Sequence, residues 1–142
     1  MKAVRLHVFG GPEVLTYEDA PRPDIGSVDV LVRVHAVGIN PPDLYLRDGY
    51  RALPPEWRPQ PNFPLIIGTD ISGVVEAIGD EAILFASGDE VSIAGDVTRP
   101  GCNAQYQWVD ERLVARKPTT LDFAEAAALP LTTIGSFPQT PE

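Results

Sequence analysis

Cysteine and histidine are nearly absent from this chain. Cys102 is the single cysteine among 142 residues, and His7 and His35 are the two histidines. One thiol cannot form an internal disulfide or supply a cysteine-rich zinc site. Neither histidine has a second histidine or cysteine three to five residues further on, the usual spacing of paired metal ligands. The sequence therefore predicts no metal site, and each of these three side chains is more typical of a packing or surface residue.

Basic residues are also scarce. The chain has 11 Lys and Arg against 20 Asp and Glu, which gives a formal net charge of −9. Binding to nucleic acid begins with neutralising phosphates, so this charge disfavours a nucleic-acid partner. No run approaches about 18 consecutive apolar residues, and residues 1–11 lack the apolar core of a secretory signal. We predict a soluble, cytoplasmic protein that neither spans a membrane nor binds nucleic acid.

The glycine pattern of a nucleotide-binding domain is missing. A dinucleotide fingerprint needs Gly-x-Gly between a strand and a helix, where the backbone approaches the pyrophosphate. None of the 12 glycines lies two positions from another, and no Gly-x-x-x-x-Gly-Lys loop exists. We predict that this chain alone binds no dinucleotide, and its cofactor-binding residues stay unknown.

Short β-strand patterns dominate what is present. Residues 28–37 alternate apolar and polar side chains, which predicts a half-buried strand with Asp29, Arg33 and His35 on the polar face. Similar segments are found at 2–9, 14–18, 65–79 (with a bend at Gly73), 89–93, 104–109 and 112–116. Two short helices are expected, at 40–48 and after Asp122, the second stopped by Pro130. Six or seven strands with these helices favour a β-barrel or sandwich.

Proline is abundant instead of scarce. Five of the 15 prolines fall between residues 51 and 64, a density at which we expect no regular element. Trp57 and Phe63 in the same stretch argue against free disorder, so an ordered surface loop is predicted.

Polar groups able to act on a carbonyl concentrate in and after residues 40–50. Tyr45 and Tyr50 offer hydroxyls that can donate to a developing enolate oxygen, and Asn40 can orient a carbonyl. Asp43 lies between them, and the Gly68-Thr69-Asp70 turn could approach a ligand through its backbone. The same residue types are equally typical of a helix cap and a tight turn, so that structural alternative stays open.

Five ordered motifs together resemble one known family. They are Val-Gly-Ile-Asn-Pro-Pro-Asp at 37–43, the segment 68–79, Gly-Asp-Glu-Val at 88–91, the strand 104–109 and Ala-Ala-Ala-Leu-Pro at 126–130. The chain resembles the N-terminal GroES-like domain of the medium-chain dehydrogenase/reductase superfamily, in its zinc-independent quinone oxidoreductase and enoyl reductase branch. This resemblance implies a mostly β fold, a GroES-like, partly open β-barrel with two or three short helices.

The resemblance also assigns roles to the polar residues. The zinc-dependent branch has Cys where Asn40 stands and Gly-His-Glu where Gly68-Thr69-Asp70 stands, so no catalytic zinc is expected. By resemblance, the catalytic residues are Asn40, Tyr45 and Tyr50, although Tyr50 lies one position from the family's tyrosine. The substrate-binding residues expected in the same way are Asp43, Thr69 and Trp57.

The family's domain plan sets further expectations. Residues 1–133 would form the GroES-like domain and residues 134–142 a divergent tail, where family members continue into a Rossmann domain. The resemblance then implies the substrate-binding half of a truncated NAD(P)H-dependent quinone or enone reductase, with a small apolar carbonyl substrate. NADPH is implied only for the full-length family. The partner would be a separate Rossmann polypeptide or further copies of this chain.

Two other functions remain open. The barrel could have abandoned redox chemistry and could shape a substrate for a cyclisation, isomerisation or dehydration. It could instead be a homo-oligomeric binding module, with residues 121–137 as its apolar contact surface. The sequence does not identify the substrate or the oligomeric state, and it does not decide whether redox chemistry is retained.

Overall fold

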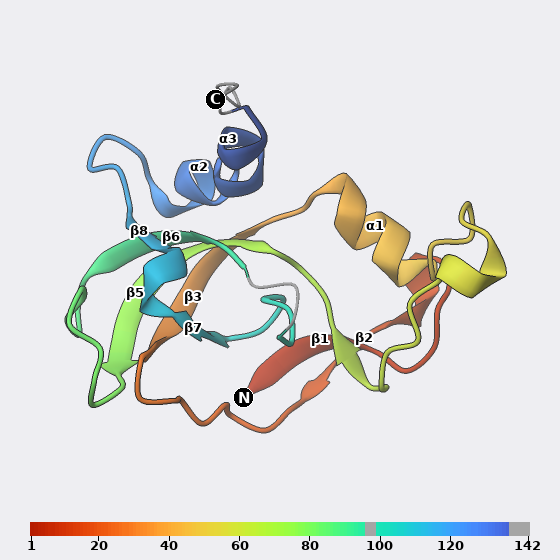
Figure 1. The fold of residues 1–142 in the computed structure, drawn as a ribbon, viewed down its shortest axis with the longest axis horizontal. Coiled ribbons are helices and arrows are strands. Elements are labelled where there is room, and N and C mark those ends of the chain that lie inside the picture. Colours follow the sequence, from red (N-terminus) through yellow and green to blue (C-terminus); the bar gives the residue numbers. More distant parts are fainter. Residues whose placement is uncertain (96–98, 137–142) are drawn as a thin grey trace.

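A computed structural model describes residues 1–95 and 99–136 (Figure 1). Their strands form two antiparallel sheets, in the orders β2-β1-β4 and β7-β3-β5-β6-β8. The three-stranded sheet contains β1 (Lys2–Leu6), β2 (Leu15–Asp19) and β4 (Leu65–Ile66). The five-stranded sheet contains β3 (Asp29–Gly38), β5 (Asp70–Ile78), β6 (Glu90–Ala94), β7 (Tyr106–Asp110) and β8 (Val114–Arg116). The predicted mostly β architecture is confirmed.

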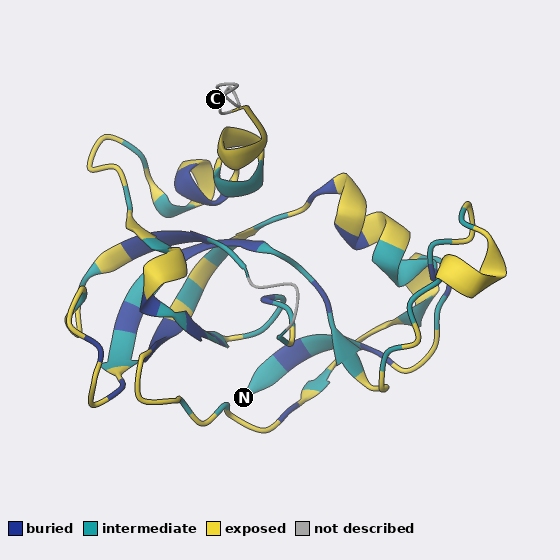
Figure 2. Ribbon diagram, viewed as in Figure 1, coloured by how far each residue is buried: buried dark blue, intermediate teal, exposed yellow. Residues whose placement is uncertain are grey.

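The core lies inside the curled five-stranded sheet. β-Branched side chains alternate along its strands and turn one face inward, where they leave water together. The buried cluster is Val30, Val32, Ile71, Val75, Val91, Ile93, Cys102 and Val109. Figure 2 shows these strands as the most buried part of the chain, whereas α1 and the loop beyond it are largely exposed. The core therefore lies against the inner face of the five-stranded sheet.

The 28–37 pattern predicts β3 correctly but misplaces two side chains. Val28 lies outside the strand and is exposed. Asp29, expected on the polar face, is 4% exposed. Its carboxylate accepts hydrogen bonds from Gly26 N, at 2.9 Å, and from Arg99 Nη1, also at 2.9 Å. A buried charge is tolerated when it is paired and hydrogen-bonded in this way, a partnership that local alternation cannot reveal.

Residues 65–79 form two strands in different sheets rather than one bent strand. β4 pairs with β1, whereas β5 pairs with β3 and β6. Gly68 lies between them with φ of +105°, a conformation that side chains disfavour. Within β5, a Cβ on Gly73 would lie 2.3 Å from the carbonyl oxygen of Arg33, and the β3–β5 register shifts nearby. The bend therefore lies at residues 67–69, and Gly73 permits close strand packing.

The helices are α1 (Pro41–Arg47), α2 (Phe123–Ala127) and α3 (Pro130–Ser136), with 3₁₀ turns η1 (Pro12–Val14), η2 (Pro55–Trp57) and η3 (Glu111–Leu113). The first two helices were predicted, and α2 opens on two reciprocal hydrogen bonds, in which the backbone N–H of Asp122 and of Glu125 each donates to the carboxylate of the other. Pro130 begins α3 instead of ending a helix, because a first-turn proline loses no hydrogen bond. The turn η2 also corrects the expectation of no regular element at 51–64. The expected tail, 134–142, starts within α3, and residues 137–142 lie outside the described ranges.

The helices α2 and α3 lie against the five-stranded sheet (Figure 1), and side-chain hydrogen bonds hold them there. Ser72 Oγ donates to the carbonyl of Phe123, and Ser92 Oγ donates to the carbonyl of Ala126 at 3.0 Å. The buried carboxylate of Asp70 accepts from Leu131 N at 2.9 Å. Two of these bonds come from Asp70 and Ser72, so they hold the first residues of β5, which follow residues 67–69 directly.

Candidate functional site

A cavity of about 250 Å³ lies between α1 and the segment that joins the two sheets. Its mixed lining includes Asp43, Leu46, Tyr50, Ile67, Thr69 and Arg99. The cavity therefore brings together three of the residues predicted from sequence, Asp43, Tyr50 and Thr69, although they are up to 26 positions apart in the chain.

Asp43 has a buried carboxyl in the first turn of α1. The side chain is 3% exposed, and its Oδ2 accepts the Asn40 N–H at 2.7 Å. Burial raises the pKa of Asp43 above its ordinary value, the Asn40 N–H opposes this, and the charge of Asp70 adds a smaller increase. The environment thus favours the protonated acid more than water does.

Thr69 lines the cavity and carries a buried hydroxyl that is unsatisfied among the described residues. Its Oγ1 is buried and has no hydrogen-bond partner among the described residues. Nearby, Asp70 is fully buried, with Oδ2 bonded to Leu131 N and Oδ1 unpartnered within the same ranges, as is Asn40 Nδ2. A buried polar group without a partner costs about 1–3 kcal/mol. The Thr69 hydroxyl therefore marks a point where a polar ligand atom would be stabilised.

Tyr50 reaches the cavity from a constrained backbone. Its φ of 50° lies in the left-handed region, which costs a residue other than glycine about 1 kcal/mol or more. The Tyr50 N–H donates to the carbonyl of Tyr45 at 2.7 Å, which holds the turn after α1. Tyr45 itself is 55% exposed and is not in the cavity lining. Asn40, the third expected catalytic residue, is buried beneath α1 and is also outside the lining.

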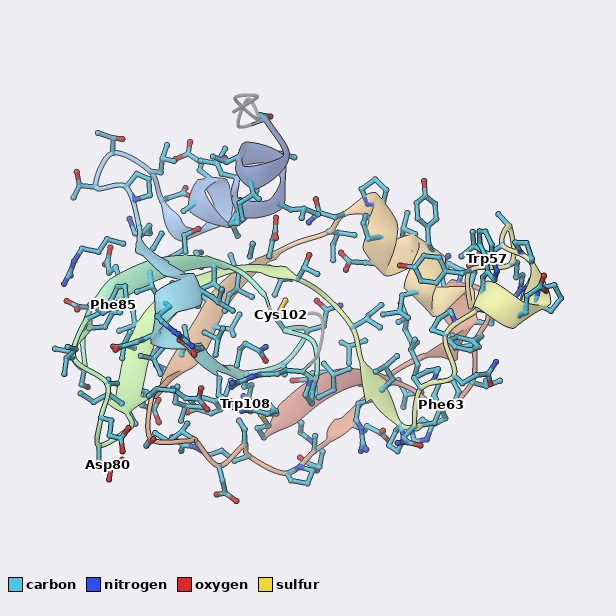
Figure 3. The ribbon with its side chains drawn as sticks, in the orientation of Figure 1. Trp57, Phe63, Asp80, Phe85, Cys102 and Trp108 are labelled. Carbon is cyan, nitrogen blue, oxygen red and sulfur yellow. The ribbon has the colours of Figure 1, made fainter. Side chains whose placement is uncertain are left out.

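Trp57 is separate from the other expected substrate contacts. It lies on η2 with 71% of its surface exposed and does not line the cavity. Figure 3 shows Trp57 at the outer end of the proline-rich loop, well away from Cys102 inside the barrel. The loop is anchored elsewhere, where Phe63 packs edge-on against Phe9 at 5.0 Å between ring centroids. This part of the loop is therefore ordered, as expected.

Sequence reasoning missed Arg99, whereas its interpretation of Cys102 as a packing residue agrees with the burial of that side chain. Arg99 lines the cavity and pairs with Asp29, but no motif surrounds it that could have identified it. Cys102 is fully buried, with Sγ 3.7 Å from the carbonyl oxygen of Asp70. Burial, with smaller contributions from the charges of Asp43 and Asp70, raises the thiol pKa strongly. The thiol therefore stays protonated and is a poor nucleophile.

The positions that resemble a zinc site do not fit zinc here. Asn40, Thr69 and Asp70 present an amide, a hydroxyl and a carboxylate, and the carboxylate is engaged by Leu131 N. Across residues 1–95 and 99–136, no three His, Cys, Asp or Glu side chains form a group that could hold a metal ion. We therefore derive no catalytic step through a metal.

Among the helices of residues 1–95 and 99–136, none has the length and apolar character that a membrane span needs.

The curled antiparallel sheet, the short helices at its end and the cavity beside α1 define a small β-barrel domain. Residues 26–119, about two thirds of the chain, match the sequence profile of the alcohol dehydrogenase GroES-like domain. The chain belongs to this family, and its fold is the GroES-like, partly open barrel of the medium-chain dehydrogenase/reductase superfamily.

Known relatives are quinone oxidoreductases and alcohol dehydrogenase-like proteins. The chain is 38% identical to the quinone oxidoreductase of Homo sapiens over 130 residues, which is 91% of this chain and 37% of that protein. The structure of the Escherichia coli quinone oxidoreductase complexed with NADPH matches with a TM-score of 0.83 and 27% identity, over 95% of this chain and 39% of that one. A putative zinc-dependent alcohol dehydrogenase from Rhizobium etli matches with a TM-score of 0.84 and 43% identity, over 94% and 38%. The chain thus spans less than two fifths of these relatives.

Proposed function

We propose that the chain forms the carbonyl-binding half of a zinc-independent reductase that acts on a quinone or an α,β-unsaturated carbonyl compound. The observation that carries this proposal is the buried, unpartnered Thr69 hydroxyl in a cavity that Tyr50 also lines. Two hydroxyl groups are suited to a carbonyl oxygen, because each can donate one hydrogen bond to it. The apolar side chains of Leu46 and Ile67 suit the body of such a substrate.

The residues of the cavity would act by orientation and electrostatics. Hydrogen bonds from Thr69 Oγ1 and the Tyr50 hydroxyl would polarise the carbonyl and would stabilise the negative charge that develops on its oxygen during reduction. Asp43, whose burial favours the protonated form, would help keep a second negative charge out of the site. Reduction adds one hydride and one proton, and the proton would reach the oxygen from Tyr50 or from water.

The hydride would come from a nicotinamide dinucleotide, as the NADPH complex of the Escherichia coli relative suggests. The described strands are all antiparallel, whereas the usual dinucleotide cradle is a parallel βαβ unit with a glycine-rich turn. We therefore assign no residue of this chain to the cofactor. We expect at most a small change in NADPH fluorescence when the 142-residue chain is added to NADPH. Tight binding would contradict the proposal.

Binding of duroquinone, a quinone that cannot arylate thiols readily, tests the site. Saturation-transfer NMR on the 142-residue chain is expected to show binding. Thr69→Val and Tyr50→Phe should each weaken it about 5–10-fold, since each removes one hydrogen bond worth about 1 kcal/mol. Tyr17→Phe is the matched control, because Tyr17 is 69% exposed on β2. If all three variants bind as the wild type does, the cavity is not the carbonyl site.

A second candidate function is a homo-oligomeric binding module. It is favoured by the exposed side chains of Leu113, Leu129 and Ile134, which border an apolar groove of about 280 Å³ beside α3. Size-exclusion chromatography over a wide concentration range tests it. A constant monomer elution volume would count against this candidate without affecting the carbonyl site.

A further inference from the structure

A second cavity, larger than the first, lies where the amino-terminal strands meet β4 and β7. Its volume is about 560 Å³, and its lining includes Arg5, Arg22, Arg99, Pro21, Pro64 and Trp108. It shares Leu65, Ile66 and Arg99 with the cavity beside α1 but contains none of the carbonyl-binding residues. We call it the arginine cavity.

The charge of this lining is opposite to that of the chain. The 142-residue chain has a net charge of −9, yet three of its nine arginines line this one cavity. No Asp or Glu is found among the described residues of the lining, although the chain has 20. In a molecule with this charge, such a concentration of guanidinium groups creates a local site for an anion.

Carboxylates outside the lining pair with all three arginines and orient them, and for Arg99 the partner is Asp29, at 2.9 Å. Arg5 Nη1 lies 3.3 Å from Glu18 Oε1 and also donates to the carbonyl of Asp19 at 3.3 Å. Arg22 Nη2 pairs with Glu76, and its guanidinium carbon lies 4.4 Å from the centre of the Tyr106 ring. The guanidinium groups of Arg5 and Arg22 each have five N–H donors, and these contacts engage one terminal nitrogen of each. Further donors therefore remain for a ligand on groups that are already oriented.

The rest of the lining is flat and apolar. Trp108 contributes an indole ring, and Pro21, Pro23, Pro64 and Pro100 contribute rigid rings. Such surfaces favour a planar hydrocarbon body, whereas the arginines favour a carboxylate, which they can bind bidentately. An inorganic anion would use only the charged part of the cavity.

We propose that the arginine cavity binds a small aromatic carboxylate, with its ring against Trp108 and its carboxylate on Arg5 and Arg22. This site is distinct from the carbonyl-binding cavity, and the proposal does not depend on the reductase function. Because Arg99 and Ile66 line both cavities, an occupant of one is adjacent to the walls of the other.

Calorimetric titration of the chain with 2-naphthoate tests this site. Arg5→Gln and Arg22→Gln should each weaken binding about 10-fold, because each removes a charge-assisted hydrogen bond. Naphthalene-2-methanol, the neutral analogue, should bind at least 10-fold more weakly than 2-naphthoate. In a Trp57→Phe background, Trp108 is the only tryptophan, and its indole N–H resonance should shift on titration.

The matched control is Arg116→Gln, since Arg116 is an exposed arginine on β8 that pairs with Asp89 outside this cavity. It should bind 2-naphthoate as the wild type does. Circular dichroism of each variant checks that the fold is retained, and the neutral analogue gives the same discrimination on unaltered protein. The proposal would be overturned if 2-naphthoate and its neutral analogue bound with equal affinity. It would also be overturned if inorganic phosphate bound as tightly as 2-naphthoate, or if the Trp108 resonance did not shift.

Discussion

Gly38, the last residue of β3, packs directly against the backbone of α2, and replacing it by alanine tests how tightly the helices are docked. A Cβ on Gly38 would lie 2.3 Å from the carbonyl oxygen of Ala127 and 3.0 Å from Cβ of Asp70. The nearer atom belongs to the backbone and cannot rotate away. Gly38→Ala must therefore displace α2, and such overpacking costs about 1–3 kcal/mol, or roughly 4–12 °C in Tm for a chain of this size.

Urea unfolding followed by circular dichroism measures this cost, and Gly135→Ala provides the matched control. A Cβ on Gly135 would meet nothing within 4 Å, and the residue lies in α3. This second substitution should be neutral or should stabilise by up to about 1 kcal/mol, since alanine favours helix. If Gly38→Ala unfolds at the same urea concentration as the wild type, the close contact between β3 and α2 is refuted.

Three further predictions concern buried groups. Cys102 should resist iodoacetamide in the native chain and react fully in guanidinium, as intact mass will show, and rapid native labelling would contradict its burial. Because the folded pKa of Asp43 is raised, the chain should lose stability as pH rises from about 3.9, the unfolded value, through the folded value. Asp43→Asn should flatten this part of the profile in urea titrations at several pH values, and an unchanged slope would argue against the assignment. Ile93→Ala should cost about 2–5 kcal/mol in urea unfolding, because Ile93 is 1% exposed in the core, whereas a loss below 1 kcal/mol would contradict tight packing there.

Local patterns in the sequence predicted most strands and the first two helices, because hydrophobic period and capping act over a few residues. The change of sheet at 67–69 was missed, since it depends on which distant strands β4 and β5 pair with. Pro130 was read as a stop, although its lack of an N–H is equally compatible with the start of α3. The burial of Asp29 depends on Arg99, 70 positions away, and no local period encodes such a partner.

Three of the six residues expected at the site lie together in one cavity, and their roles stay predictions. Asp43, Tyr50 and Thr69 do line one cavity, because the motifs that carry them flank α1 and the crossing between sheets. Tyr45 lies on α1, five positions before Tyr50. Its side chain is exposed and does not line the cavity. Trp57 was also expected to contact substrate, but it lies on an exposed 3₁₀ turn and does not line the cavity.

The central position of β1 in its sheet has a consequence for how the chain folds. One edge of β1 pairs with β2, which is close in sequence. Its other edge pairs with β4 at residues 65–66, and Ala3 forms a further bridge with Ala104. During synthesis, β1 can therefore pair only with β2 until about sixty further residues have followed, and its pairing is complete only after about a hundred. Such long-range pairing is intrinsically slow, and an unpaired strand edge is prone to aggregate. β1 is thus made well before the segments that complete its pairing.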